Sequence, residues 1–268
     1  MITEYKTGSD FWEANRELLN TAPDLTAFFK LDSPLLKETN RSNYALKCEN
    51  GGNTLLALKI EPFNCLLFGD AACAPELLSF IMNGGYELKH YLSESTLGDA
   101  VLEELEKTYG LSCRETLAMD YLEAEQQTEP SSAEVLTADE SDLDEICECL
   151  EHFITDCGLH DTIDRKQTKK TIGSFRLIRK NGEIVSMARM APAAETAVRI
   201  VAVYTRDAYR GKGYARKVVN TLKNEILSAG RRAVLNVDRN NPISYHLYAS
   251  LGFRRVFSQG EYRISDPA

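Results

Sequence analysis

A glycine-rich loop between a predicted strand and a predicted helix constrains the fold of this 268-residue chain more than any other feature. The loop is Arg210-Gly211-Lys212-Gly213-Tyr214-Ala215, and it follows a run at 200–205 that is rich in β-branched residues, as a buried strand would be. Beyond the loop, apolar residues recur at helical spacing until Gly230: Ala215, Val218, Val219, Leu222, Ile226 and Leu227. Glycines let the backbone approach a phosphate, and a helix start offers unpaired N–H groups. The sequence therefore predicts a pyrophosphate site, to which Arg210 and Lys212 add positive charge.

Composition and charge exclude several classes of partner. The chain is 43% hydrophobic and 26% charged, which is typical of globular proteins with one large or two ordinary domains. Its net charge of −9 argues against nucleic acid as the main partner, and no apolar run reaches the roughly 18 residues of a membrane span. The N-terminus lacks the pattern of a signal peptide, and the seven scattered cysteines are typical of reduced thiols. We therefore expect a cytoplasmic protein.

Two groups of potential metal ligands are better explained in other ways. Cys147 and Cys149 fall in an apolar helical pattern, and no second Cys/His pair lies at zinc-finger spacing. His152, Cys157 and His160 fall between two predicted helices, and we interpret them as the lining of an acceptor pocket or as a plain loop. We expect no metal.

A change of composition between Glu123 and Glu134 divides the chain. This acidic segment contains Pro130 and two serines and has no large apolar residue, which is typical of a linker. We therefore predict an N-terminal domain at 1–127, a linker at 128–133 and a C-terminal domain at 134–268.

The C-terminal domain reads as alternating strands and helices. Ser141 is predicted to cap the first helix, and Asn181-Gly182 is a strong signal for a two-residue hairpin turn. The predicted strands are 135–136, 175–178, 184–190, 197–205, 233–237 and 253–257, and helices lie at 141–153, 164–172, after the glycine loop, and at 242–251. This order predicts a mixed sheet with helices on its faces.

The N-terminal domain repeats part of this order. Helices are predicted at 11–19, 75–84 and 96–109, and strands at 55–61, 64–68, 89–92 and 113–121. The loop that matches the glycine loop, Gly69–Ala74, contains Asp70 and has neither Arg nor Lys. Because an acidic loop repels a pyrophosphate, we expect the first domain to have lost its nucleotide site if the two domains are related.

Together with a motif further along the chain, the loop resembles the GNAT superfamily of N-acetyltransferases over about residues 134–268. The resemblance rests on Val203-Tyr204-Thr205, on Tyr209–Ala215, and on Asn241-Pro242-Ile243-Ser244 followed by Tyr248 and Gly252-Phe253. It implies an α/β (α+β) chain of two tandem GNAT-like domains, the first degenerate. Each would have a mixed, mostly antiparallel twisted sheet flanked by helices.

The resemblance also implies a V-shaped opening between two central strands that holds acetyl-CoA. The backbone of Val203 and Thr205, on either side of Tyr204, would pair with the pantetheine arm. Asn241 and Ser244 would line the other side of the cofactor, and Tyr248 would protonate the departing thiolate. The pyrophosphate would be bound by the loop residues Arg210, Gly211, Lys212, Gly213, Tyr214 and Ala215.

The chemistry of Tyr248 also has an argument of its own. Ser244 and Tyr248 are i,i+4 neighbours on one helix face, and a positioned phenol is a plausible acid for a poor leaving group. The alternative is a core tyrosine whose hydroxyl binds the backbone. The general base is open: Glu195, Glu183 and His246 are candidates by residue type, and a water relay or an already neutral substrate would need none of them.

The sequence therefore predicts an N-acyltransferase that moves an acetyl group from acetyl-CoA to an amine by direct attack in a ternary complex. A small molecule or a peptide would be the acceptor, and the protein would be a monomer or homodimer. The alternative is a non-catalytic acetyl-CoA-binding sensor or assembly module. A nucleoside triphosphate binder is disfavoured because the loop has no Gly-Lys-Ser/Thr ending.

Overall fold

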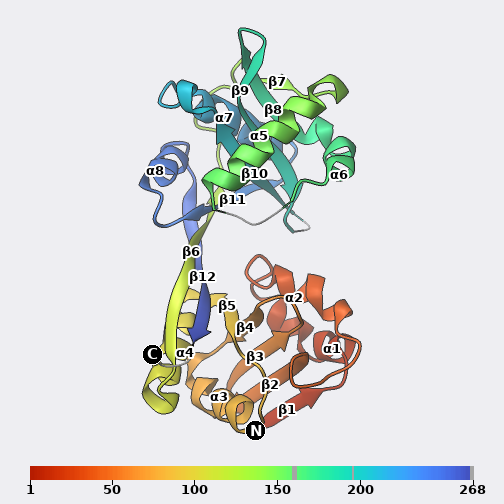
Figure 1. The fold of residues 1–268 in the computed structure, drawn as a ribbon, viewed down its shortest axis with the longest axis vertical. Coiled ribbons are helices and arrows are strands. Elements are labelled where there is room, and N and C mark those ends of the chain that lie inside the picture. The colour runs from red at the N-terminus through yellow and green to blue at the C-terminus, as the bar shows by residue number, and fades with distance from the viewer. Residues whose placement is uncertain (159–161, 195, 266–268) are drawn as a thin grey trace. The chain divides into compact units, whose positions relative to one another are not determined.

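The computed structural model describes residues 1–158, 162–194 and 196–265. The chain forms two compact units, which are described separately below (Figure 1). Unit 1 comprises Met1–Asp120, Asp238–Asn240 and Phe257–Ala268, and unit 2 comprises Tyr121–Val237 and Asn241–Val256. Among the described residues, no helix is both long enough and apolar enough to cross a membrane.

Unit 1 is a mixed sheet with helices on both faces. Its elements are β1 (Ile2–Tyr5), α1 (Gly8–Leu19), α2 (Ala27–Asp32), the short 3₁₀ helix η1 (Ser33–Leu35), β2 (Tyr44–Asn50), β3 (Asn53–Lys59), β4 (Cys65–Gly69), η2 (Ala71–Cys73), α3 (Ala74–Asn83), β5 (His90–Glu94), α4 (Ser95–Tyr109), β6 (Ser112–Ala124) and the end of β12 (Arg254–Ser265). Strands β1 to β4 pair antiparallel in succession, and β4 and β5 are parallel.

The last strand of the chain completes the sheet of unit 1. Strand β12 pairs antiparallel with β5, from Gln259 opposite Glu94 to Arg263 opposite His90. The Tyr262 ring stacks on the Tyr91 ring with centroids 4.7 Å apart, and both residues are buried. The two units therefore differ from the predicted domains at 1–127 and 134–268, because residues 257–265 belong to unit 1.

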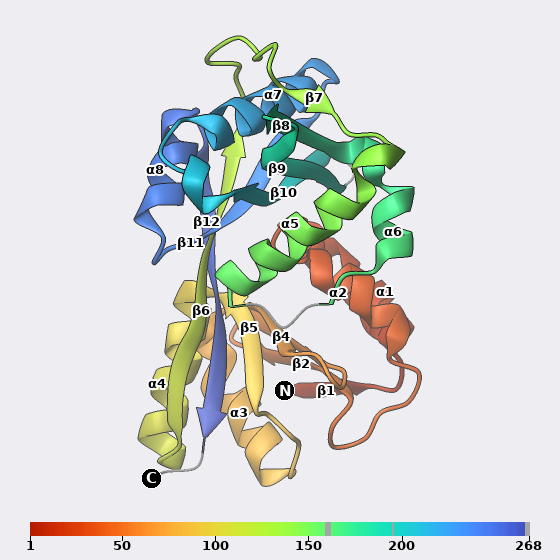
Figure 2. The same cartoon turned by 45° about the horizontal axis from the view of Figure 1, so that its top comes forward.

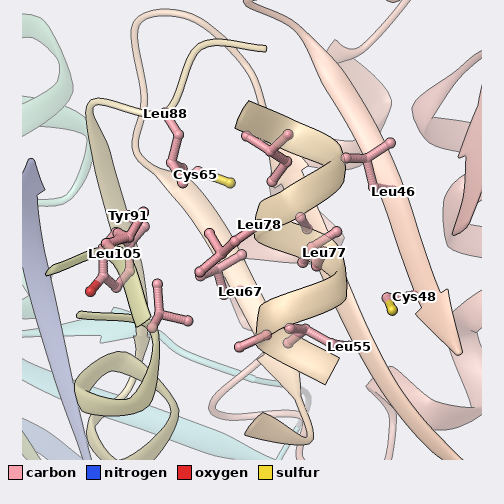
Figure 3. Close-up of a cluster of buried hydrophobic side chains, with 14 of the residues drawn as sticks. Leu46, Cys48, Leu55, Cys65, Leu67, Leu77, Leu78, Leu88, Tyr91 and Leu105 are labelled. Carbon is pink, nitrogen blue, oxygen red and sulfur yellow. The ribbon is translucent and has the colours of Figure 1, made fainter. Parts of the chain in front are cut away.

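Helices α3 and α4 cover one face of this sheet. Figure 3 shows Leu77 and Leu78 of α3 packed over Leu55 and Leu67 from strands β3 and β4. A second cluster, which includes Phe11 of α1 and Phe29 of α2, packs against the opposite face. The alternation of Ala45, Leu46, Lys47 and Cys48 sends successive side chains to opposite faces, and three of the four are fully buried.

Unit 2 repeats the element order of unit 1. A strand is followed by two helices, three strands, a helix, a strand, a helix and a final strand. The elements are β7 (Leu136–Thr137), η3 (Glu140–Asp142), α5 (Leu143–Asp156), α6 (Arg165–Lys170), η4 (Ile172–Ser174), β8 (Phe175–Lys180), β9 (Glu183–Pro192), β10 (Ala197–Thr205), η5 (Asp207–Tyr209), α7 (Tyr214–Ser228), β11 (Arg232–Asp238), α8 (Pro242–Ser250) and the start of β12. This is the mixed, mostly antiparallel sheet flanked by helices that the sequence predicted.

Helices α5 and α7 pack on opposite faces of the unit 2 sheet, as Figure 2 shows. Ile146 and Cys149 of α5 pack against Phe175 and Leu177 of β8. On the other face, α7 packs its apolar residues against β8 to β11: Val218, Val219, Leu222 and Ile226. The predicted hairpin is confirmed, because Asn181 and Gly182 have φ of 54° and 87°, and Lys180 pairs with Glu183.

The segment 128–133, predicted to be a linker, is held against α7 inside unit 2. The Asn220 side-chain amide donates to the carbonyls of Glu129 and Pro130 at 3.2 and 2.9 Å. Lys223 is fully buried, and its ammonium donates to Thr128 Oγ1 at 2.7 Å and to the Leu251 carbonyl at 2.8 Å. Polar side chains of α7 therefore hold this segment, largely through its backbone carbonyls.

Candidate active site

The two central strands of unit 2 part halfway along their length. Strands β10 and β11 pair in parallel at only three positions, of which Arg199 opposite Val234 is the last, yet β10 continues to Thr205 and β11 to Asp238. On the other side of β10, pairing with β9 shifts between Val201 and Tyr204, and Ala202 has a φ of 53°. A β-bulge thus lies beside the point where the strands separate. Beyond it, the β10 backbone facing β11 has no described ladder partner, so it is free to pair with an extended ligand.

The glycine loop follows directly after this strand. Gly211 and Gly213 have φ of 73° and 79°, a conformation that other residues adopt only with strain. Gly213 is the N-cap of α7, and it supplies no side-chain cap for the first amides of the helix. A Cβ added at either glycine would meet nothing within 4 Å. A helix start without a side-chain cap, behind glycines with open space beside them, fits a pyrophosphate.

The two charged side chains of the loop also hold its shape. Arg210 lies 2.5 Å from a carboxylate oxygen of Asp156 and 2.8 Å from one of Asp207, and its Nε donates to the Thr205 carbonyl. Lys212 donates to the Ala208 carbonyl at 2.9 Å. The loop therefore carries the positive charge that the sequence predicted, although Arg210 forms ion pairs with two carboxylates.

Glu183, one of the candidate bases, lies beside the loop and has a structural partner. Its Oε1 accepts a hydrogen bond of 2.7 Å from the Tyr209 hydroxyl, which raises the pKa of Tyr209. The Tyr209 ring in turn lies 6.2 Å from the Tyr214 ring, centre to centre. The hydrogen bond from Tyr209 to Glu183 therefore connects the hairpin strand β9 to the glycine loop. The carboxylate of Glu183 thus orders the loop.

Helix α8 supplies the second predicted motif. Asn241 is its N-cap and is exposed, and its Oδ1 accepts from the Ser244 amide at 3.0 Å. Tyr248 is 6% exposed and packs against Phe253, with ring centroids 6.1 Å apart. Burial raises the pKa of Tyr248, so the phenol stays protonated at neutral pH. No hydrogen bond to its hydroxyl is found among the described residues, so its proton has no fixed acceptor there.

The remaining candidate bases, Glu195 and His246, and the histidines predicted to line an acceptor pocket divide into those the structure describes and those it does not. Glu195 and His160 lie outside the described residues. His246 is exposed on α8. His152 of α5 has its Nδ1 3.2 Å from the hydroxyl of Tyr204, a buried tyrosine on β10 whose pKa burial raises. Periodicity gave no signal for this pair, because it joins two elements that only the packing of α5 brings together.

Within the described part of the chain, no three histidine, cysteine or carboxylate side chains are grouped so that they could hold a metal ion.

Comparison with known proteins identifies the family of unit 2. Residues 135–253 match the model of the acetyltransferase (GNAT) family. The whole chain is similar in fold to a GCN5-related N-acetyltransferase from Sphaerobacter thermophilus, at 12% identity, with 99% of this chain and 96% of that chain covered and a TM-score of 0.67. It is also similar to a GNAT-family acetyltransferase from Colwellia psychrerythraea, at 12% identity, with 98% and 100% covered and a TM-score of 0.61.

A Drosophila protein shares the fold of the whole chain as well, at 10% identity, with 100% of this chain and 99% of that chain covered and a TM-score of 0.59. No curated protein matches the sequence. At these identities the likeness to solved structures concerns the fold alone, whereas the family model matches the sequence of unit 2. Residues 135–253 of this chain therefore match the acetyltransferase (GNAT) family in sequence, and the chain shares its fold with solved members of that family.

Proposed function

We propose that unit 2 binds acetyl-CoA and transfers its acetyl group to the nitrogen of an amine. The observation that carries the proposal is the uncapped start of α7 behind Gly211 and Gly213, next to two strands that part. The amides of residues 211–215 would bind the pyrophosphate. The backbone of Val203 and Thr205 would bind the pantetheine arm, and Asn241 and Ser244 would line its other side.

The residues of the chain supply the proton transfers. The bound cosubstrate supplies a thioester carbonyl for the amine to attack. Tyr248 holds a proton that it can give to the departing sulfur, and its burial keeps that proton in place at neutral pH. Glu195 remains a candidate for receiving the amine proton. The His152–Tyr204 pair on the α5 side of β10 is a second candidate.

Unit 1 has no equivalent phosphate site in this proposal. Its strands β4 and β5 also pair at only two positions, so the parting of the strands is repeated there. In the loop that follows β4, however, Asp70 Oδ1 accepts from the Ala72 amide at 2.8 Å. The Asp70 carboxylate thus accepts a hydrogen bond from a backbone amide that a bound phosphate would need. This supports acetyl transfer by unit 2 alone.

Titration calorimetry of the full chain with acetyl-CoA tests the binding step. We expect saturable binding, and no heat of binding at millimolar acetyl-CoA would contradict the proposal.

Acetyl transfer to a panel of amines tests the chemical step. Tyr248→Phe is expected to lower turnover, whereas Tyr245→Phe, a half-buried tyrosine on the same helix, is the matched control. Unchanged turnover in Tyr248→Phe would refute the acid role of Tyr248, although the proposal that the protein is an acetyltransferase would stand. Binding without turnover of any amine would favour the alternative, an acetyl-CoA sensor.

A further inference from the structure

Two arginines of unit 2 are neighbours on the sheet face that α5 covers. Arg189 of β9 pairs with Val201 of β10, and Arg199 of β10 pairs with Ala191 of β9. In this antiparallel register the two arginines are diagonal neighbours with side chains on one face. Arg189 also pairs with Phe175, which packs against α5, and its guanidinium lies 5.8 Å from the centre of that ring.

Neither guanidinium has a carboxylate partner among the described residues. Arg189 is half-buried, and burial alone lowers its pKa, with no acid to oppose the shift. Arg199 places its guanidinium 5.9 Å from the Tyr121 ring centre, and its buried Nε has no hydrogen-bond partner. Five other half-buried arginines of unit 2 each pair with a carboxylate: Arg176, Arg179, Arg206, Arg216 and Arg232. Because a buried cation without a counter-ion is costly, this pair is arranged for an anion that comes from outside.

The pair lies where the acetyl group would be delivered. Arg199 stands opposite Val234 in the last parallel pair before β10 and β11 separate. Asn236, two residues beyond Val234, shares that face, and its buried Oδ1 has no partner among the described residues. Two unmatched cations and an unmatched hydrogen-bond acceptor therefore flank the point where the strands part.

These groups fit a ligand that carries a carboxylate close to an amine. A guanidinium binds a carboxylate through two parallel hydrogen bonds, and the Asn236 oxygen accepts from an amine N–H. We propose that the acceptor is a free amino acid, with Arg189 and Arg199 binding its carboxylate. The inference rests on the acetyl-transfer function proposed above. In the reaction, the N–C bond forms and the C–S bond of the thioester breaks. The nitrogen loses one proton, the sulfur gains one, and the carboxylate takes no part.

The experiment compares each amino acid with its carboxamide, which lacks the negative charge of the carboxylate. The full chain and acetyl-CoA are incubated with the twenty L-amino acids, β-alanine and γ-aminobutyrate, and with their carboxamides, and acetylated products are measured by mass spectrometry. We expect at least one acid to be acetylated with kcat/KM at least tenfold above that of its amide.

Variants then assign the preference to the arginines. Arg199→Gln is expected to lower kcat/KM for the acid by about 10- to 100-fold, mainly through KM, and to leave the amide unchanged. Arg199→Lys is expected to restore part of the loss. Arg254→Gln, which removes an exposed arginine of the same unit, is the charge-matched control. Thermal unfolding of each variant checks that the fold is kept.

Three results would overturn the inference while the proposed function stands, provided that calorimetry shows acetyl-CoA binding. They are equal rates for acids and amides, equal losses for both in Arg199→Gln, and turnover of no amino acid at all. Faster turnover of 2-aminoethylphosphonate than of every carboxylate would also overturn it and reassign the pair to a phosphonate or phosphate. Failure of acetyl-CoA to bind would instead refute the proposed function.

Discussion

Tyr248 shows how burial and chemistry combine in a single side chain. Its ring packs in the core of unit 2, whereas its hydroxyl has no hydrogen-bond partner among the described residues. Burial raises its pKa because the charged phenolate loses the solvation of water. The phenol therefore keeps its proton over the whole neutral and mildly alkaline range, as the proposed acid role requires.

The pH dependence of acetyl transfer should reflect this shift. Since the folded phenol keeps its proton above its ordinary pKa of about 10, its ionisation should cause no loss of kcat between about pH 8 and pH 10. Tyr248→Phe should lower kcat by about 100-fold or more, with acetyl-CoA affinity unchanged. Steady-state rates across this range measure both effects. A fall of the wild-type rate near pH 8.5 that Tyr248→Phe abolishes would contradict the assignment.

The cysteines differ sharply in reactivity for a related reason. Six of the seven are buried and Cys157 is exposed. Burial raises the pKa of Cys65 to about 12 and that of Cys149 to about 11, so their reactive thiolates are scarce at pH 8. Brief maleimide treatment of the native protein should add one label, read by mass, and none to Cys157→Ser. Two or more rapid additions would show that the thiols of the core are accessible.

Some residue roles could be predicted from the sequence, and others depend on pairing. Asn181-Gly182 and Asn241 act locally, so their turn and cap were predictable from adjacent residues. Ser141, in contrast, was predicted to cap the following helix, but it lies inside the 3₁₀ turn η3, whose N-cap Asp139 accepts from the Ser141 amide at 2.8 Å. The N-cap of α5 is Asp142. Arg189 and Arg199 become neighbours only through the register of β9 and β10, which the sequence pattern does not specify.

At the scale of elements, the loop and α7 act as one unit. Two glycines with positive φ turn the chain from β10 into the helix, and polar residues on α7 hold the segment 128–133 against it. The apolar face of α7 was visible in its 3.6-residue period. Its polar partners were not, because the segment that they bind lies about 90 residues earlier in the chain.

The geometry of the loop can be tested with a matched pair of glycines. Gly213 and Gly230 flank α7 with φ of 79° and 71°, and a Cβ at either would meet nothing within 4 Å. Changing each to alanine should therefore cost a similar stability, about 1 kcal/mol, measured by urea unfolding. Gly213→Ala alone should weaken acetyl-CoA binding by about tenfold, equivalent to ~1.4 kcal/mol. Equal affinities in the two variants would mean that the loop does not bind the cosubstrate.

Strand predictions failed where pairing is non-local. Strands β1 and β2 were missed. Strand β1 has only four residues, and β2 has buried residues on both faces of the sheet, so it lacks a clear alternation of apolar and polar residues. The last strand was predicted to end at Phe257, yet it continues to Ser265 through Gly260 and several polar residues. Its partner β5 lies more than 160 residues earlier in the chain, and no local pattern records that contact.

At the scale of the whole molecule, the repeated order of elements is the main regularity. Among the described residues, β1 to β6 with α1 to α4, and then β7 to β12 with α5 to α8, follow the same order of helices and strands, apart from the short 3₁₀ turns. The sequence showed the repeat only from the third strand onward, because the earlier strands of unit 1 were not recognised. The glycine loop itself is not repeated, since Asp70 stands at the corresponding place in unit 1.

The contribution of β12 to unit 1 predicts how fragments behave. Residues 1–127 alone should fail to unfold cooperatively in urea, because β5 lacks one of its two partner strands and Tyr91 loses the stacked ring of Tyr262. Joining residues 254–265 to this fragment through a flexible linker should restore a cooperative transition, followed by near-ultraviolet circular dichroism. A cooperative transition of the unextended fragment would show that unit 1 does not depend on β12.

The same strand has a consequence for synthesis on the ribosome. Proteins commonly fold from the N-terminus as they emerge, domain by domain. Here the sheet of unit 1 cannot be completed until residues 254–265 are translated, after nearly all of unit 2. One edge of β5 pairs with β4, but the other edge waits for β12, so unit 1 is begun before unit 2 and completed after it.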